Sequence, residues 1–327
     1  MEGERGLFKF GGVLIIVFLV IAAGAYATTG AGRPAVGVAA ALGEPPAGGA
    51  PPPEEGAARP PAHAVCTVDG SPRPLGDEIH ESSGVAVSRT HAGLFWTHND
   101  SGDPLLYAVD AQGRTAGRVR VSGASVQDWE DIALAPCPAG GDCLYVADIG
   151  DNDAKRGSVT VYRVAEPAPG ASETAPAAPL RLRYPDGAHD AEAMFVLNGA
   201  IHVVTKGESG PIALYRAPAG AGAEATLELL RTLSPDRVGK PERITGADAS
   251  ADGRWVVLRT LGEAMIFPAA ALAGSGAASP LRVDLGELDE KQGEGIGFTP
   301  DGSLVLTSEG GRKKDPATVA RLSCTLP

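Results

Sequence analysis

The sequence predicts an all-β protein, a β-propeller with five four-stranded blades. Helix signals are few and glycine is abundant, with 44 residues among 327, which favours many short strands and turns. One strand–turn–strand pattern recurs five times at intervals of about 50 residues, which is typical of propeller blades. The last repeat also lacks a fourth strand, and the start of the domain can supply it.

Each repeat opens with a polar residue that is followed by small and apolar residues. The opening residues are 49, 62, 53 and 49 positions apart: Glu81, Glu130, Glu192, Thr245 and Glu294. A turn then leads to a second strand, expected at residues 94–98, 144–147, 201–205, 255–258 and 304–307. A β-sandwich also contains many short strands, but it gives no reason for a whole meander to recur with its opening polar residue.

The outer strands follow in the same order. We expect the third and fourth strands of the first four repeats at residues 105–109 and 118–121, 159–164 and 180–184, 212–216 and 226–233, and 263–267 and 281–285. In the fifth repeat, residues 317–324 form the third strand. Residues 64–68 complete that blade, so that the two ends of the domain pair and close the ring.

Four cysteines permit three pairings. Ring closure places Cys66 beside Cys324, and Cys137 and Cys143 flank one tight loop, so we expect disulfides 66–324 and 137–143. Zinc binding is the poorer interpretation, because no two cysteines have the CxxC spacing. Disulfides of this kind form in oxidising compartments outside the cytoplasm.

The N-terminal segment predicts export. Arg5 and Lys9 precede an apolar run, and Ala25-Tyr26-Ala27 offers a cleavage site, so residues 1–27 are expected to be a signal peptide or a transmembrane signal anchor. Residues 28–62, rich in Ala, Gly and Pro, are expected to form a disordered tether, and residues 63–327 the propeller domain. The domain would be secreted, periplasmic or attached to the membrane through the N-terminal segment alone.

The net charge of −12 and the lack of a basic run argue against nucleic acid as a partner. In a propeller blade the first strand is innermost, and antiparallel pairing places its start beside the end of the second strand. One mouth of a monomeric propeller should therefore collect the opening residues and the second-strand ends, which include Glu309. A small molecule or a ligand of the cell envelope would bind there.

This mouth is predicted to hold a divalent cation. The expected ligands are Glu81, Asp100, Asp128, Glu130, Asp131, Asp148, Asp151, Asn152, Glu192 and Glu294. Crowded carboxylates repel one another, and oxygen ligands without a convergent His and Cys set favour calcium. The alternative is structural: the glutamates bind backbone N–H groups of neighbouring blades, and the aspartates form Asx turns.

Lys206 and Arg259 end two of the expected second strands, so the mouth also contains positive charge. With Glu130 they form the predicted catalytic set. Glu130 would act as the base for a metal-bound water, while the two cations hold an anionic or ester-like substrate such as a phosphoester, carboxylate or lactone. Alternatively, they only pair with the carboxylates, and the protein is a non-catalytic binding module.

Three segments, residues 96–102 (WTHNDSG), 128–133 (DWEDIA) and 148–152 (DIGDN), resemble a family of uncharacterised exported bacterial β-propeller proteins. That resemblance implies a propeller but no established reaction. More remotely, the acidic mouth is similar in layout to the senescence-marker/gluconolactonase propellers and to the propeller phytases. Those proteins use carboxylates and Asn around calcium. Because they have six blades, the resemblance makes six blades the alternative to the five expected for this chain.

Overall fold

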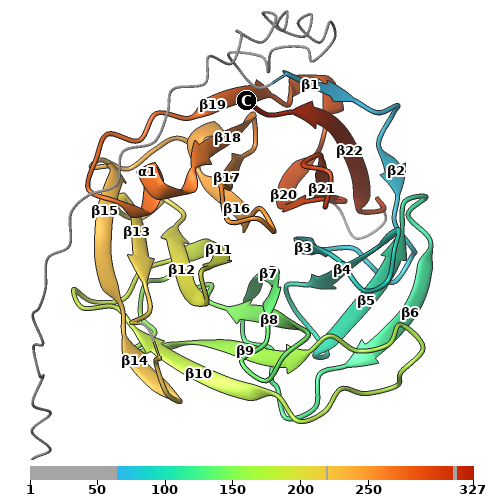
Figure 1. Ribbon diagram of the computed structural model, residues 1–327, viewed down its shortest axis with the longest axis horizontal. Coiled ribbons are helices and arrows are strands. Elements are labelled where there is room, and N and C mark those ends of the chain that lie inside the picture. Colours follow the sequence, from blue (N-terminus) through green and yellow to red (C-terminus); the bar gives the residue numbers. More distant parts are fainter. Residues whose placement is uncertain (1–64, 219, 312–314) are drawn as a thin grey trace, which may run out of the picture. The chain divides into compact units, whose positions relative to one another are not determined.

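The computed structural model describes residues 65–218, 220–311 and 315–327. They form a five-bladed β-propeller, in which five mainly antiparallel sheets surround a central axis (Figure 1). The predicted fold class and blade number are therefore confirmed. The expected signal segment, residues 1–27, and the expected tether, residues 28–62, lie outside the described residues.

Each blade runs from an inner strand beside the axis to an outer strand. Blade 1 is β3 (Ser82–Val87), β4 (Leu94–Asn99), β5 (Leu105–Asp110) and β6 (Thr115–Arg120). Blade 2 is β7 (Trp129–Pro136), β8 (Asp142–Asp148), β9 (Val159–Ala165) and β10 (Ala178–Arg183). Blade 3 is β11 (Ala191–Leu197), β12 (Ala200–Thr205), β13 (Ile212–Arg216) and β15 (Glu228–Ser234).

The last two blades follow the same plan. Blade 4 is β16 (Ile244–Ala249), β17 (Trp255–Thr260), β18 (Glu263–Pro268) and β19 (Leu281–Asp284). Blade 5 is β20 (Gln292–Phe298), β21 (Leu304–Glu309), β22 (Thr318–Thr325) and β1 (Val65–Val68). The short elements between strands include η1 (Lys240–Glu242), α1 (Ala269–Ala273) and η2 (Gly286–Leu288). Among the described residues, none of these helices is long and apolar enough to cross a membrane.

The ring closes where β1 pairs with β22. Cys66 lies opposite Cys324 in this pair, and disulfides join Cys66 to Cys324 and Cys137 to Cys143. The predicted closure and both predicted pairings are confirmed. A bridge between residues 258 positions apart restricts the unfolded chain, which in the chain-entropy view stabilises the fold by about 5 kcal/mol. The two-residue strand β2 (Arg73–Pro74) adds a second contact with β22.

One outer strand differs from the prediction. Residues 226–233 were expected to form a single strand, but the chain bends at Leu227, whose side chain is buried between blades 2 and 3. The preceding strand β14 (Glu224–Thr226) pairs in parallel with β10 of blade 2, and only β15 joins blade 3. The buried leucine and this exchanged strand connect the two blades at their outer edges.

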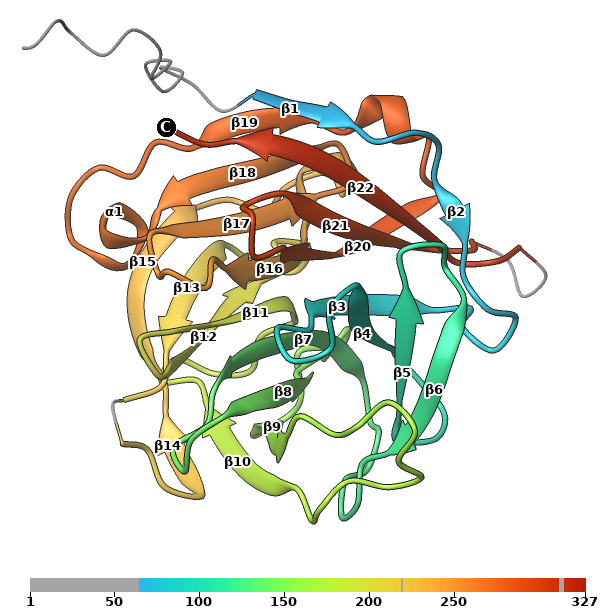
Figure 2. The same ribbon diagram turned by 45° about the vertical axis from the view of Figure 1, so that its right-hand side comes forward.

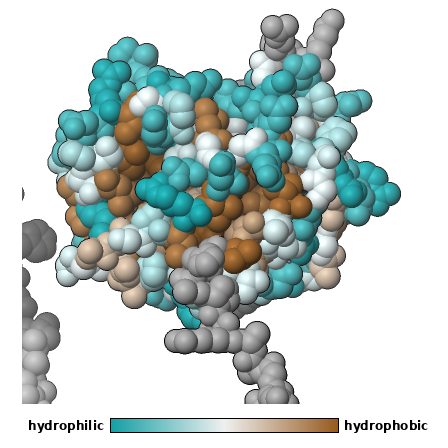
Figure 3. All heavy atoms as spheres, turned by 90° about the horizontal axis from the view of Figure 1, so that it is seen from above, coloured by the Kyte–Doolittle hydropathy of each residue, from teal (hydrophilic) through white to brown (hydrophobic). Residues whose placement is uncertain are grey.

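The core consists of apolar side chains packed between adjacent blades. Figure 2 shows the ring of blades in a tilted view. Between blades 1 and 2, for example, Trp96 packs with Trp129 and Leu144, all fully buried. Each such side chain contributes roughly 1.5–3 kcal/mol by burial. Seen from the side of β1 and β19, hydrophobic atoms also gather at the surface (Figure 3). The cluster between blades 4 and 5 includes partly buried residues such as Leu281.

Candidate functional site

At one mouth, a β-bulge interrupts each inner strand. The register shifts between Trp129 and Asp131 in β7 and at equivalent points of the other inner strands. The residues in these bulges are Glu130, Glu192, Thr245 and Glu294, with exposed fractions of 8, 8, 4 and 6%. A bulge adds one residue and redirects its side chain without ending the ladder. The bulges therefore give four of the opening residues one structural position, here called the inner ring.

In blade 1 the inner-ring residue is Ser83. The register of β3 shifts between Ser82 and Val85, and Gly84 lies against the backbone of Asp131, the residue that follows Glu130. Glu81 is therefore two residues before the ring, and the alignment that placed it in the ring is wrong by that amount. The run of small residues after Glu81 fits the repeat whether Glu81 or Ser83 is taken as the opening residue, so the sequence pattern alone did not distinguish these two alignments.

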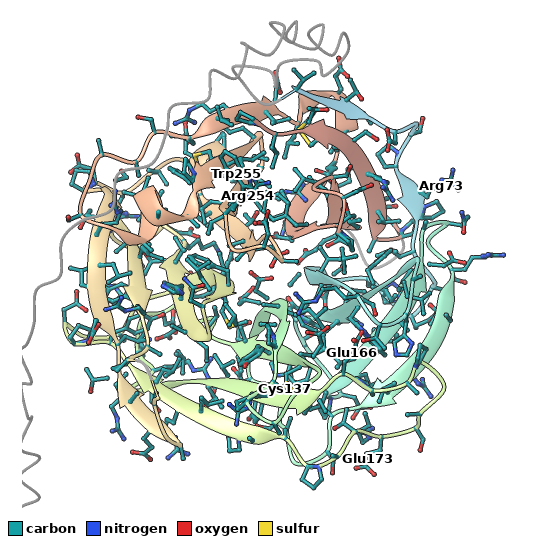
Figure 4. The ribbon with its side chains drawn as sticks, viewed as in Figure 1. Arg73, Cys137, Glu166, Glu173, Arg254 and Trp255 are labelled. Atoms are coloured by element: carbon teal, nitrogen blue, oxygen red, sulfur yellow. A yellow bond between two sulfur atoms is a disulfide. The ribbon has the colours of Figure 1, made fainter. Side chains whose placement is uncertain are left out.

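The same register defines an outer tier, two residues before each ring position. Its members are Glu81, Asp128, Asp190, Arg243 and Gln292. A third set follows the second strands, where Asp100, Lys206 and Glu309 have equivalent positions. The mouth thus brings together most of the carboxylates that were predicted to meet, and Figure 4 shows side chains with oxygen atoms around the central opening.

Gly150 allows two of these carboxylates to approach the backbone that follows β8. A methyl group at Gly150 would overlap with Glu130 Oε1 and with Asp128 Oδ2. Asn152 lies close by, and its Nδ2 donates a hydrogen bond to Asp128 Oδ2 at 3.4 Å. The glycine of the DIGDN segment therefore has a steric role in the site.

Burial and mutual repulsion raise the pKa values of the mouth carboxyls. Burial is the largest cause for Glu130 and Glu294, whose pKa values rise well above the usual range, and repulsion by Glu192 adds to both. Burial likewise raises the pKa of Glu192, Asp100 and Glu309 to about 7. The carboxylates of the mouth are held close enough to disfavour their own ionised forms.

Lys206 is the lysine that reaches these carboxylates. Its Nζ pairs with Glu192 Oε1 and lies 3.5 Å from Glu208 Oε2 and 3.8 Å from Asp190 Oδ2. Although burial alone would lower the pKa of Lys206, the charge of Glu192 and the other acidic neighbours raise it above the usual range. The side chain is therefore a fixed positive charge, and it is 14% exposed.

Arg259 is not equivalent to Lys206. It pairs with Gly246 inside β17, whereas Lys206 follows the last residue of β12, so Arg259 lies two residues deeper. It is fully buried, and its Nη2 pairs with Glu290 Oε2. Its Nη1 donates hydrogen bonds to the carbonyl oxygens of Gly295 at 2.8 Å and Thr307 at 3.0 Å. The prediction that Arg259 and Lys206 share one register at the mouth is wrong.

Asp131, predicted as a metal ligand, has structural partners instead. Its Oδ1 accepts a hydrogen bond from Ile132 N at 2.8 Å, and its Oδ2 accepts bonds from Met194 N at 2.8 Å and Ala247 N at 3.2 Å. These donors belong to the inner strands of blades 2, 3 and 4. For this residue the structure supports the alternative that carboxylates bind backbone N–H groups of neighbouring blades.

Asp148 and Asp151 are also engaged. Asp148 Oδ1 lies 2.9 Å from Arg156 Nη1, and the carboxylate accepts backbone bonds from Gln127 and Asp128 at 3.2 Å each. Asp151 Oδ2 accepts a bond from Arg156 N at 2.6 Å. These contacts fix the loop after β8 and leave these two carboxylates less available to a ligand than those of Glu130 or Glu294. Across residues 65–218, 220–311 and 315–327, no group of three or more His, Cys, Asp and Glu side chains is arranged to hold a metal ion.

Two basic residues of the mouth were missed. Lys240 and Arg243 line a pocket of about 210 Å³ together with Lys206, Glu192 and other residues. Arg243 immediately precedes the ring strand β16, at the place that Asp128 and Asp190 take in their blades. An alignment extended two residues before each ring position would have identified it.

Comparisons with known proteins give likenesses of fold but no family. No family model and no curated protein matches this chain. A PQQ-bound aldose sugar dehydrogenase from Streptomyces coelicolor is 13% identical, with a TM-score of 0.49 over 81% of this chain and 100% of its own. The apo-form of the soluble aldose sugar dehydrogenase from Escherichia coli is 12% identical, with a TM-score of 0.47 over 79% and 99%.

A third solved structure is the calcium-binding protein regucalcin from Agrobacterium tumefaciens. It is 14% identical, with a TM-score of 0.43 over 76% of this chain and 92% of its own. At such low similarity these proteins assign no reaction and no ligand to the present chain. The resemblance to an uncharacterised exported family stays a prediction.

Proposed function

We propose that the protein is an extracytoplasmic propeller that binds a divalent cation, calcium before magnesium or manganese, at its acidic mouth. The cation-loaded mouth would hydrolyse a small anionic or ester-like molecule, such as a phosphoester or a lactone. The observation that carries the proposal is the convergence of Glu130, Glu192 and Glu294 from three blades. Each of these residues is at most 8% exposed. Lys206 offsets part of the repulsion at Glu130 and Glu192, and Arg259 offsets part of it at Glu294.

The donor atoms at the mouth are of the kind that such a cation binds, although the described side chains are not arranged as a preformed metal site. These donor atoms are carboxylate oxygens, which calcium prefers. Asn152 lies beside Asp128 but turns its amide nitrogen toward that carboxylate. Burial first, and then repulsion by neighbouring carboxylates, raises the pKa values of Glu130 and Asp128, so that keeping both groups ionised is unfavourable without a counter-charge. A cation that displaces their protons would relieve this cost. We expect Glu130 and Asp128 to hold it, with Asp100 beside them.

Two groups of the chain would then act on a substrate. A bound divalent cation supplies a polarising charge and an activated water. Glu130, whose carboxyl has a raised pKa, would accept a proton as general base. Lys206, held in place by Glu192, would stabilise negative charge that develops on the substrate. Arg259 is left out of this set, because its guanidinium is enclosed by Glu290 and two backbone carbonyls.

The extracytoplasmic location rests on two supports. The disulfides Cys66–Cys324 and Cys137–Cys143 are of the kind that persists in oxidising compartments. The charged and apolar pattern of residues 1–27 predicts export. Detection of the protein in the exported fraction of its own cells would test the location, and a purely cytoplasmic protein would contradict it.

The experiment for the cation is a melting curve with calcium and with EDTA. We expect calcium to raise the melting temperature of the wild type and of Glu173→Gln, an exposed residue at the outer edge of the ring (Figure 4), but not of Glu130→Gln. A panel of phosphoesters and lactones then tests hydrolysis with the same variants. A melting temperature indifferent to calcium, magnesium, manganese and EDTA would overturn the cation site.

A second candidate function is that of a non-catalytic binding module. A pocket of about 500 Å³ lies at the hairpin end of β3 and β4, far along the strand from Ser83, and is lined by Val87, Phe95 and other apolar residues. Its volume suits a small ligand. Binding of the fluorescent dye anilinonaphthalene sulfonate that is lost in Ala92→Trp, yet indifferent to Glu130→Gln, would favour this function.

A further inference from the structure

Blade 4 departs from the acidic pattern of the mouth. Its inner-ring residue is Thr245, while the ring positions of the two neighbouring blades hold Glu192 and Glu294. Its outer-tier residue is Arg243, where blades 2 and 3 have aspartates. One sector of the mouth is therefore neutral to basic, because blade 4 has a threonine and an arginine at the two positions where blades 2 and 3 have acidic residues.

A pocket of about 210 Å³ occupies this sector. Lys206, Lys240 and Arg243 contribute positive charge to its lining, and Glu192 and Glu294 form part of the acidic side. The pocket thus adjoins the carboxylates to which we assign the cation. A molecule bound in this pocket would contact basic side chains on one side and the inner-ring glutamates, near which we propose the cation, on the other.

The basic side chains of the pocket differ in how many ion-pair and hydrogen-bond partners they already have within the protein. Lys240, on η1, is exposed and forms no ion pair within the described part of the chain. Arg243 is 24% exposed; its Nη2 lies 2.8 Å from Glu208 Oε1, and its Nε has no hydrogen-bond partner. Glu208 also lies 3.5 Å from Lys206 Nζ, so one carboxylate holds two of the basic groups at the pocket. Lys240 and Arg243 keep donor capacity for a ligand.

We propose that this pocket is an oxyanion subsite, which takes a carboxylate or phosphate group of the small molecule that the mouth binds. The inference rests on the proposed function and adds where and by which residues the acidic group is recognised. Lys240 and Arg243 bind the oxyanion, since ammonium and guanidinium groups form strong charge-assisted hydrogen bonds to such oxygens. Lys206 lines the same pocket and pairs with the inner-ring residue Glu192. The ligand therefore combines an acidic group with an ester-like group a few atoms away.

The test is a titration with inorganic phosphate and, separately, acetate at pH 6.5, with magnesium rather than calcium as the cation because calcium phosphate precipitates. Isothermal calorimetry on the full chain gives the affinity. We expect binding to weaken about tenfold in Lys240→Gln and again in Arg243→Gln, the loss of one charge-assisted hydrogen bond each. Lys155→Gln, an exposed lysine paired only with Asp153, is the matched control and should bind as the wild type does.

A calcium melting shift measured on the same variants separates this inference from the proposed function. The double variant Lys240→Gln/Arg243→Gln should fold and keep the calcium shift while it loses phosphate and acetate binding. Wild-type binding of both anions that persists in the double variant would overturn the subsite, as would a wild type that binds neither anion although calcium shifts its melting temperature. A missing calcium shift with anion binding intact would overturn the cation proposal and leave the subsite supported.

Discussion

Two ion pairs of the mouth region differ in their exposure to solvent. Lys206 pairs with Glu192 at a pocket, and its side chain is 14% exposed. Arg259 pairs with Glu290 two residues deeper, is fully enclosed, and also binds the carbonyl oxygens of Gly295 and Thr307. The first pair is placed to meet a ligand, whereas the second joins β17 to the strands of blade 5.

Hairpin length explains the difference. In blade 3, Leu197 pairs with Ala200 across a two-residue turn, whereas in blade 4 Ala249 pairs with Val256 across a longer one. Lys206 and Arg259 are each 14 residues after their ring residues, but the longer turn uses two of those positions in blade 4. Lys206 and Arg259 therefore lie at different depths in their blades, although each follows its ring residue by the same number of positions.

The strongest test of the contrast is Arg259→Met. The change leaves Glu290 buried without its partner and two carbonyl groups without a donor, so we expect the free energy of unfolding to fall by about 3–5 kcal/mol. Lys206→Met should cost much less, because its site borders solvent and Glu192 can take up a proton. Urea unfolding of both variants measures the difference. Equal losses would show that the two pairs play the same structural role.

A second test adds volume beside the deeper pair. A methyl group at Gly293 would occupy the place of the Arg259 guanidinium. Gly293→Ala should therefore destabilise the protein by about 1–3 kcal/mol, as over-packing does. Gly210→Ala is the control, since a methyl group there meets nothing within 4 Å. Thermal melting of the two variants compares them, and a neutral Gly293→Ala would contradict the close packing of Arg259.

A third test concerns the pair at the mouth. Lys206→Gln removes the positive charge that competes with a bound cation, and we expect calcium affinity to rise about tenfold, equivalent to about 1.4 kcal/mol. Under the proposed mechanism hydrolysis should fall at the same time, because the variant lacks the charge to which we assign substrate stabilisation. Calcium titration by calorimetry and an activity assay give the two readouts. Weaker calcium binding would place Lys206 away from the cation.

The smallest expected effect is on pH dependence. Glu192, Asp100 and Glu309 have folded-state pKa values of about 7, above their usual values, so the folded state binds more protons than the unfolded state near neutrality. Stability must then fall as pH rises through 7. Without calcium we expect the melting temperature to drop by about 2–4 °C between pH 6.5 and 8.5. Calcium should remove most of this drop.

Below pH 6.5 two buried histidines act in the other direction. Burial lowers the pKa of His98 and His202 to about 4, so their protonation favours the unfolded state as the pH falls. The stability maximum should therefore lie near pH 6.5 in the absence of calcium. Calorimetry across pH 5–8.5 measures the expected fall in melting temperature on both sides of this maximum. A flat profile above pH 6.5, or the same drop in Glu192→Gln as in the wild type, would contradict the assignment to the mouth carboxyls.

Much of the fold was predictable because its signals are local. The recurrence of the hairpin and the alternation of turns identified all five blades, and the missing last strand indicated the pairing of Cys66 with Cys324. The exchanged strand β14 was not predictable, since its partner β10 belongs to another blade. The mouth was predicted as a collection of carboxylates, but bulges and unequal turns shifted Glu81 and Arg259 from their expected places.

By itself, the sequence determined the ring, its closure and the concentration of acidic residues at one mouth, since period and spacing along the chain suffice for these. Only the tertiary structure decided which of these carboxylates accept hydrogen bonds from other blades. Asp131 receives hydrogen bonds from Met194 and Ala247, which belong to other blades, while its neighbour Glu130 in the bulge stays in the ring. Within the described residues, donors far away in the chain bind Asp131 but not Glu130, so adjacent residues of one strand have different surroundings.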